Sequence, residues 1–196
     1  MTASRRNALV AAVAATVVLG MAVGVWPVSS APEDEIKAVH SGKVMDVAGS
    51  TTPGTPVLQG SSNGSDEQAW NVVELARING WPLVLIQSRQ TGLVLDVVAG
   101  STGAGAPLVQ KPWAASASQL WLLLPYGNTG WEIILNIKSG RVADVAGASS
   151  DDGASVIQWD WRGGANQIWD VPTPEPLPTT TTTTEATTTT TEPPTT

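Results

Sequence analysis

The residues of this chain that could do chemistry are carboxylates, tryptophans and side-chain amides, because the sequence has no cysteine and one histidine, His40. Without cysteine, disulfides, thiol catalysis and thiolate metal sites are excluded. His40 has no counterpart elsewhere in the chain, so a catalytic triad or a histidine metal site has little to build on. Asp151, Asp152 and Asp160 could supply the paired carboxylates that hydrolyse glycosides. Asp151 and Asp152 lie in a Ser/Gly-rich stretch typical of a solvated turn, so we expect no catalytic residue, metal or cofactor.

The tryptophans and amides recur in a Gln-x-Trp tripeptide that closes three segments of similar length. The tryptophans of the three tripeptides are 51 and then 48 residues apart. Asp46, Asp96 and Asp144 precede the closing glutamines by 22, 23 and 23 residues, so the register holds over whole segments. A fixed period of this kind indicates one structural unit built three times. The tripeptides are Gln68-Ala69-Trp70, Gln119-Leu120-Trp121 and Gln167-Ile168-Trp169.

Each copy is predicted to be four short β-strands joined by Gly-rich turns. The copies span about residues 35–76, 81–126 and 131–172, and each begins with an apolar stretch such as Val84-Leu85-Ile86. Many of these residues are β-branched, which favours strands, and no apolar pattern of helical period persists for ten residues. The sequence therefore predicts one all-β domain over residues 32–172 with twelve strands.

These copies resemble the ricin-type (ricin B-chain-like) β-trefoil lectins, which also occur as carbohydrate-binding modules of bacterial secreted glycosidases. The strongest match is the stretch from Gly153 to Trp169, which holds Trp159-Asp160-Trp161 and the closing Gln-Ile-Trp. The resemblance implies a β-trefoil, a six-stranded barrel capped by three hairpins. It also implies up to three shallow sugar sites, with the closing tryptophans in the core and the closing glutamines bonded to local backbone.

Sugar binding needs a flat aromatic face for the apolar side of the ring and fixed polar groups for adjacent hydroxyls. The resemblance assigns the polar groups to the early aspartate and to an asparagine before the closing glutamine, and the aromatic to a position eight residues ahead of that glutamine. The third copy matches throughout, with Asp144, Trp159, Asn166 and Gln167. We expect these four residues to bind carbohydrate, with Gln167 bracing Asn166.

The other two copies are expected to have lost their sugar sites. The first keeps Asp46 but has Gly60 at the aromatic position and Glu67 at the asparagine position. The second keeps Asp96 but carries Lys111 and Ser118 at those positions. Neither glycine nor lysine offers a flat face for stacking.

Structural roles remain open for several of these residues. Asp144 could be purely structural, because Asp46 and Asp96 persist in copies that look inactive. Trp159 could be core, although glycine and lysine at the matching positions favour exposure, and Asn166 could simply make a turn. Trp161 matches Trp113 and Ser62, where many relatives carry cysteine, so packing in place of a disulfide is expected there. Structural roles are also expected for one glutamine per copy, at Gln59, Gln110 and Gln158.

The partner is expected to be a carbohydrate, bound by a monomer. A net charge of −7 excludes electrostatic binding of nucleic acid. The resemblance allows galactose-type or pentose-type oligosaccharides and polysaccharides, and the sequence leaves the choice of sugar open. The alternative is a protein-binding or inhibitory trefoil with vestigial sugar sites.

The two ends differ from the repeats in composition. Residues 1–31 have Arg5 and Arg6, an apolar run over 8–25 and a small-residue exit, which predicts an export signal and a secreted protein. The general and twin-arginine routes both stay open, and an uncleaved membrane anchor is the alternative because 18 apolar residues are near the short limit of a span. Residues 173–196 are rich in Thr, Pro and Glu and are expected to be a disordered spacer or a glycosylated stalk.

Overall fold

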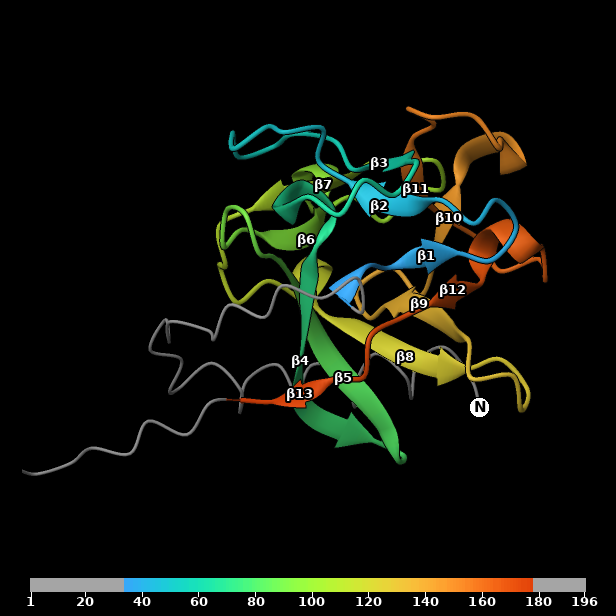
Figure 1. The fold of residues 1–196 in the computed structure, drawn as a ribbon. Coiled ribbons are helices and arrows are strands. Elements are labelled where there is room, and N and C mark those ends of the chain that lie inside the picture. The colour runs from blue at the N-terminus through green and yellow to red at the C-terminus, as the bar shows by residue number, and fades with distance from the viewer. Residues whose placement is uncertain (1–33, 178–196) are drawn as a thin grey trace, which may run out of the picture.

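The computed structural model describes residues 34–177, and these form a β-trefoil (Figure 1). The all-β prediction is confirmed: the three repeats supply twelve strands, and the helical segments in the described part are three-residue 3₁₀ turns. The first repeat holds β1 (Lys37–Ala38), β2 (Val44–Asp46), β3 (Leu58–Gly60) and β4 (Trp70–Ile78). The second holds β5 (Trp81–Ser88), β6 (Val94–Val97), β7 (Leu108–Lys111) and β8 (Trp121–Pro125). The third holds β9 (Glu132–Asn136), β10 (Val142–Val145), β11 (Val156–Trp159) and β12 (Trp169–Asp170).

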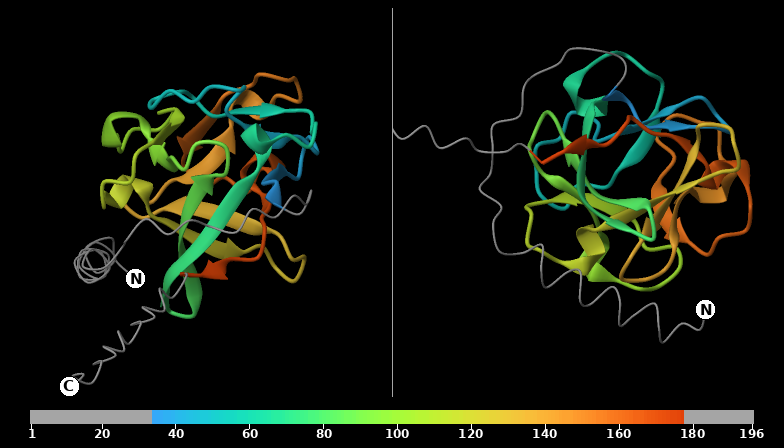
Figure 2. Two further views of the ribbon diagram at one scale, coloured as in Figure 1. Left: turned by 60° about the vertical axis from the view of Figure 1, so that its left-hand side comes forward. Right: turned by 90° about the horizontal axis from the view of Figure 1, so that it is seen from below.

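The first and last strands of each repeat form the barrel. Neighbouring strands pair in the order β4, β5, β8, β9, β12 and β1, all antiparallel. A bridge between Glu35 and Ala69 closes the barrel by joining the start of the first repeat to the residue just before β4. Seen from below, the three repeats surround a common axis (Figure 2).

The middle strands of each repeat form a hairpin, and the three hairpins cap the barrel. Asp46 is paired with Leu58, Asp96 with Val109 and Asp144 with Ile157, so the sequence register is also the strand register. The glycine before each aspartate strand has a φ of 69° or 70°, a left-handed turn that favours glycine (Gly42, Gly92 and Gly140). Isolated bridges Pro56–Val109, Leu58–Ser155 and Pro107–Ile157 join the hairpins to one another.

The closing tryptophans fill the shared core, as predicted. Trp70, Trp121 and Trp169 are fully buried in one apolar cluster that draws on all three repeats. Each indole Nε1 donates a 3.1 Å hydrogen bond to the carbonyl just before the aspartate of its own repeat, on Met45, Leu95 and Ala143. A buried indole N–H needs such a partner, and this bond ties each hairpin to the barrel.

The domain continues beyond the predicted boundary at residue 172. A thirteenth strand, β13 (Glu175–Pro176), pairs in parallel with Val73 and Glu74 of β4, so the first residues of the predicted spacer belong to the sheet. The predicted export signal at 1–31 and the remainder of the spacer lie outside the described residues. Over residues 34–177, no helix has the length and apolar character needed to cross a membrane.

Candidate functional site

The closing glutamine makes the same backbone contacts in all three repeats. Its Nε2 donates to the carbonyl seven residues earlier, on Ser61, Pro112 and Asp160. Its Oε1 accepts from the backbone N–H five residues earlier, on Asn63, Ala114 and Arg162. All three glutamines are 1 % exposed, so their first role is to satisfy a loop backbone, as the family resemblance implied.

In the third repeat this scaffold also holds the candidate sugar-binding carboxylate. Gln167 Nε2 donates to Asp144 Oδ2 at 2.7 Å, and Asn166 Nδ2 donates to Asp144 Oδ1 at 3.0 Å and to the Val145 carbonyl at 3.1 Å. The structure therefore brings three of the four predicted site residues into direct contact. The expectation that Gln167 braces Asn166 is corrected: both amides hold Asp144 instead.

Trp159 lies on the same face of the β10–β11 hairpin as Asp144. It is paired with Val142, two residues before Asp144, and side chains two apart share a strand face. The Trp159 side chain is half-buried, whereas Gln158 on the opposite face is fully buried. The indole is close to the second repeat, since a Cβ added to Gly105 would lie 3.2 Å from Trp159 Cζ3. The sequence favoured an exposed Trp159; in the structure this residue is half-buried and lies outside the central core cluster.

The environment of Asp144 perturbs its titration. Only 5 % of the residue is exposed, and this burial raises the pKa of its carboxyl above the usual value. The hydrogen bonds from Gln167 and Asn166 and the charge of His40 act against that rise in pKa.

His40 is a neighbour of the site that the sequence did not indicate. It comes from the first repeat, and its Nε2 donates to the Ser149 carbonyl of the third at 2.8 Å. In the repeat register His40 corresponds to Lys138, whose Nζ donates to the Gly100 carbonyl of the preceding repeat. Both residues occupy the same repeat position and donate to a carbonyl of another repeat. The sequence alone does not show which repeat lies next to that position, so the contact could not be predicted.

The first repeat cannot hold an aromatic platform in the same place. Asp46 accepts from Gln68 Nε2 at 2.8 Å, as in the third repeat. Gly60, however, is buried, and a Cβ added to it would lie 2.7 Å from Asp46 Oδ2. Glu67 replaces the amide donor with a second carboxylate. This carboxylate lies against Gly49: a Cβ added to Gly49 would be 3.0 Å from Glu67 Oε2.

The second repeat differs again. Asp96 is 5 % exposed and accepts from the Val97 N–H at 2.7 Å. Ser118 is buried, and its hydroxyl meets that of Ser116 at 2.8 Å. Lys111, at the end of β7, offers an ammonium group where the third repeat has an indole. The arrangement of carboxylate, two amide donors and an indole therefore occurs in the third repeat alone among the described residues.

Comparison with known proteins agrees with this architecture. The family model described as ricin-type beta-trefoil lectin domain-like matches residues 24–111, 66–159 and 117–190. Among solved structures, the designed threefold-symmetric protein ThreeFoil is 38 % identical with a TM-score of 0.65, over 69 % of this chain and 94 % of its own. An exo-β-1,3-galactanase from Clostridium thermocellum is 30 % identical with a TM-score of 0.65, over 70 % of this chain and 29 % of its own. The ricin B-like lectin of Macrolepiota procera in complex with lactose is 20 % identical with a TM-score of 0.58, over 75 % of this chain and all of its own, a likeness of fold. A search of curated proteins gave no match.

Proposed function

The chain belongs to the ricin-type β-trefoil lectin domain-like family, and from this we propose that it is a non-catalytic carbohydrate-binding protein with one working site, in its third repeat. The observation that carries the proposal is the carboxylate of Asp144, held by Asn166 and Gln167 on the hairpin face that also bears Trp159. The other two repeats lack the indole and the asparagine donor.

Each group has a distinct task in this proposal. The oxygens of Asp144 accept hydrogen bonds from adjacent sugar hydroxyls, and the Asn166 amide contributes a further polar contact. The exposed part of the Trp159 indole covers the apolar C–H face of the sugar ring. Gln167 binds no sugar directly and keeps Asp144 oriented. A single shallow site of this kind should bind with a Kd of roughly millimolar to tens of micromolar, or about 4 to 6 kcal/mol.

Galactose-type oligosaccharides are the first ligands to test. The galactanase is 30 % identical to this chain, which spans 29 % of it, so the shared part is a module and not the whole enzyme. Pentose-type chains such as xylo-oligosaccharides are the second series.

Calorimetric titration with β-1,3-galacto-oligosaccharides and xylo-oligosaccharides tests the site. Trp159→Lys copies the residue of the second repeat, and Asn166→Ala removes the amide; each should weaken binding about tenfold or more, or about 1.4 kcal/mol. Lys111→Ala, at the matching position of the second repeat, is the control and should bind normally. If binding survives Trp159→Lys but is lost when Asp46 or Asp96 is changed, the working site is in the first or second repeat and the proposal of a third-repeat site is wrong. Silence across a glycan array with an intact fold would favour the protein-binding alternative.

The place of action is also a proposal. Arg5, Arg6 and the apolar run at 8–25 support export from the cytoplasm. Sequencing the N-terminus of native protein should find a start near Ala31 or Pro32. A start at Met1 or Thr2 in a detergent-extracted fraction would favour an anchor, and the same start in the cytosol would refute export.

A further inference from the structure

An aromatic pair outside the proposed site is exposed where the end of the second repeat meets the third. Trp161 is 42 % exposed and Tyr126 is 37 % exposed. Their rings meet edge to face, with centroids 6.3 Å apart and an interplanar angle of 67°. This edge-to-face contact places the two exposed rings side by side on the surface.

The pair is anchored to the scaffold that holds Asp144. Trp161 is two residues beyond Trp159, which ends β11. Gln167 fixes the backbone on both sides of Trp161: Nε2 donates to the Asp160 carbonyl at 2.9 Å, and Oε1 accepts from the Arg162 N–H at 2.8 Å. The same Nε2 donates to Asp144. Two residues of chain span at most about 7 Å, so Trp161 follows the proposed sugar platform closely.

The matching positions in the other repeats have different surroundings. Trp113 of the second repeat is half-buried and packs against a second apolar cluster, which confirms the expected packing role there. The first repeat has Ser62. Trp161 departs from the packing prediction, because it is largely exposed in the one repeat that carries a complete candidate site.

We propose that Trp161 and Tyr126 form a second contact for the glycan held at Trp159, so that the protein binds an oligosaccharide chain and not a single sugar. The inference rests on the proposed function. Charged groups flank Trp161: Arg162 is exposed, and the Asp160 side chain is 53 % exposed although its Oδ1 is 3.0 Å from Arg141 Nε. Such groups can accept from and donate to hydroxyls. Two aromatic rings among charges are also far smaller than the roughly 800 Å² per partner of a stable protein interface.

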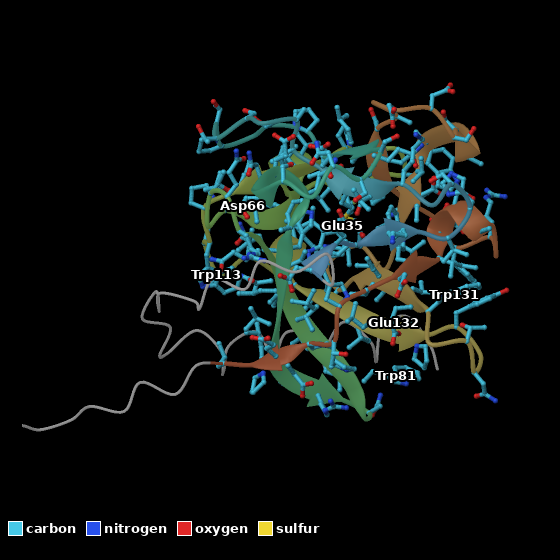
Figure 3. The ribbon with its side chains drawn as sticks, viewed as in Figure 1. Glu35, Asp66, Trp81, Trp113, Trp131 and Glu132 are labelled. Atoms are coloured by element: carbon cyan, nitrogen blue, oxygen red, sulfur yellow. The ribbon has the colours of Figure 1, made fainter. Side chains whose placement is uncertain are left out.

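The test compares ligands of increasing length. We expect the affinity of the wild-type protein for β-1,3-galacto-oligosaccharides, or for the xylo-oligosaccharide series, to rise about tenfold between one and four units. Trp161→Ser, which copies the first repeat, should remove most of that gain and leave the affinity for the single sugar within about twofold. Tyr126→Ala should act in the same direction. The control is Trp81→Ala, because Trp81 is also 42 % exposed but lies on the β4–β5 hairpin (Figure 3).

The outcomes separate this inference from the proposed function. The second contact is overturned if the affinity does not depend on oligosaccharide length, or if the gain in affinity with length survives Trp161→Ser. The proposed site at Trp159 still stands in either case if binding is lost in Trp159→Lys. An equal loss for the single sugar and the tetrasaccharide also overturns the second contact, because Trp161 would then belong to the first contact. Lack of binding to both series and across a glycan array would overturn the proposed function and this inference together. Thermal melting of each variant confirms that the fold is intact.

Discussion

The three aspartates show how one residue type at one register position can have different chemistry. A buried carboxylate is costly unless hydrogen bonds satisfy it. Asp144 accepts from two side-chain amides and Asp46 from one, whereas Asp96 accepts from the adjacent backbone N–H of Val97. The aspartates are thus shared by the fold, while the set of donors around Asp144 belongs to the third repeat.

As the pH is lowered, sugar affinity should begin to fall at a pH above the one at which an ordinary exposed aspartate is protonated. Burial raises the pKa of Asp144, so as the pH falls its carboxylate takes up a proton sooner than an exposed aspartate does. A protonated carboxyl accepts hydrogen bonds from hydroxyls less well, so binding weakens as the pH drops through that raised pKa. Titrations between pH 7 and 4 measure this effect. Asp144→Asn should bind weakly with little pH dependence below pH 6, and an unchanged wild-type affinity down to pH 4 would contradict the assigned role.

Glu132 offers a prediction about stability. It shares a strand face with the buried Ile134, two residues along β9, and no described group donates to its buried Oε2 (Figure 3). Burial raises the pKa of Glu132, so its ionisation destabilises the fold; this cost is complete above the raised pKa, shrinks as the pH falls below it, and is gone below the ordinary pKa of an unfolded glutamate. Glu132→Val copies Val84 of the second repeat, which is paired with Trp121 as Glu132 is with Trp169.

We expect Glu132→Val to raise the Tm at pH 7, by about 2 to 4 °C for each kcal/mol gained. The gain should shrink as the pH is lowered toward 4. Calorimetry over this range checks both parts, with the exposed Glu175→Val as control. A lower Tm at pH 7 would mean that the carboxylate has a stabilising role.

At the scale of elements, one buried glutamine per repeat links each hairpin to its neighbour. Gln158 Nε2 donates to the Ser101 and Gly103 carbonyls of the second repeat at 3.0 and 2.8 Å. Gln110 Nε2 reaches the Ser50 carbonyl of the first, and Gln59 Nε2 reaches the Ser149 and Asp151 carbonyls of the third. These contacts agree with the structural role expected for the three glutamines.

Gln158→Ala should therefore destabilise the whole domain. It removes both inter-repeat bonds and the 2.7 Å bond that Gln158 Oε1 accepts from Ser139. The cost should be about 2 to 3 kcal/mol: a fully buried orphaned group costs about 1 to 3 kcal/mol, but Ser101 and Ser139 are half-buried and Gly103 is exposed, so water can replace part of the loss. Urea unfolding should show a lower midpoint with an unchanged slope. Gln87→Ala, which removes a bond to Gly92 within one hairpin turn, is the matched control and should change stability by less than about 0.5 kcal/mol.

The sequence predicted the elements well because the repeat register is also a strand register. Asp, glycine turn and Gln-x-Trp recur at fixed spacing, and the turn glycines and the Gln-x-Trp residues make equivalent contacts within each copy. Contacts between copies could not be predicted in this way, because a repeated sequence defines the content of one unit but not which loop of the next unit that unit contacts. Trp113 and Trp161 have the same register and different burial for that reason. Strand β13 was missed because its pairing with β4 is parallel and carries no local signal.

Over the whole molecule, stability depends on closing a ring of three similar parts. The core cluster contains all three closing tryptophans, and each hairpin is bridged to both of the others. The Lys43–Asp152 pair, with Nζ and Oδ1 2.6 Å apart, joins the first repeat to the third. The Lys43 contact lowers the pKa of Asp152. No repeat buries its apolar face alone, which is the physical meaning of the period.

A chain that ends after Tyr126 should therefore not fold. It would lack β9 to β12, so β8 and β1 would each lose a barrel partner and Trp70 and Trp121 would lose the third part of their cluster. Near-UV circular dichroism should be lost, and heating should give no cooperative transition. A chain that ends after Leu177 keeps strands β1 to β13 and is the control; it should melt within a few degrees of the full chain. Cooperative melting of the shorter chain at any temperature would show that two repeats suffice, and would refute the requirement for a closed ring.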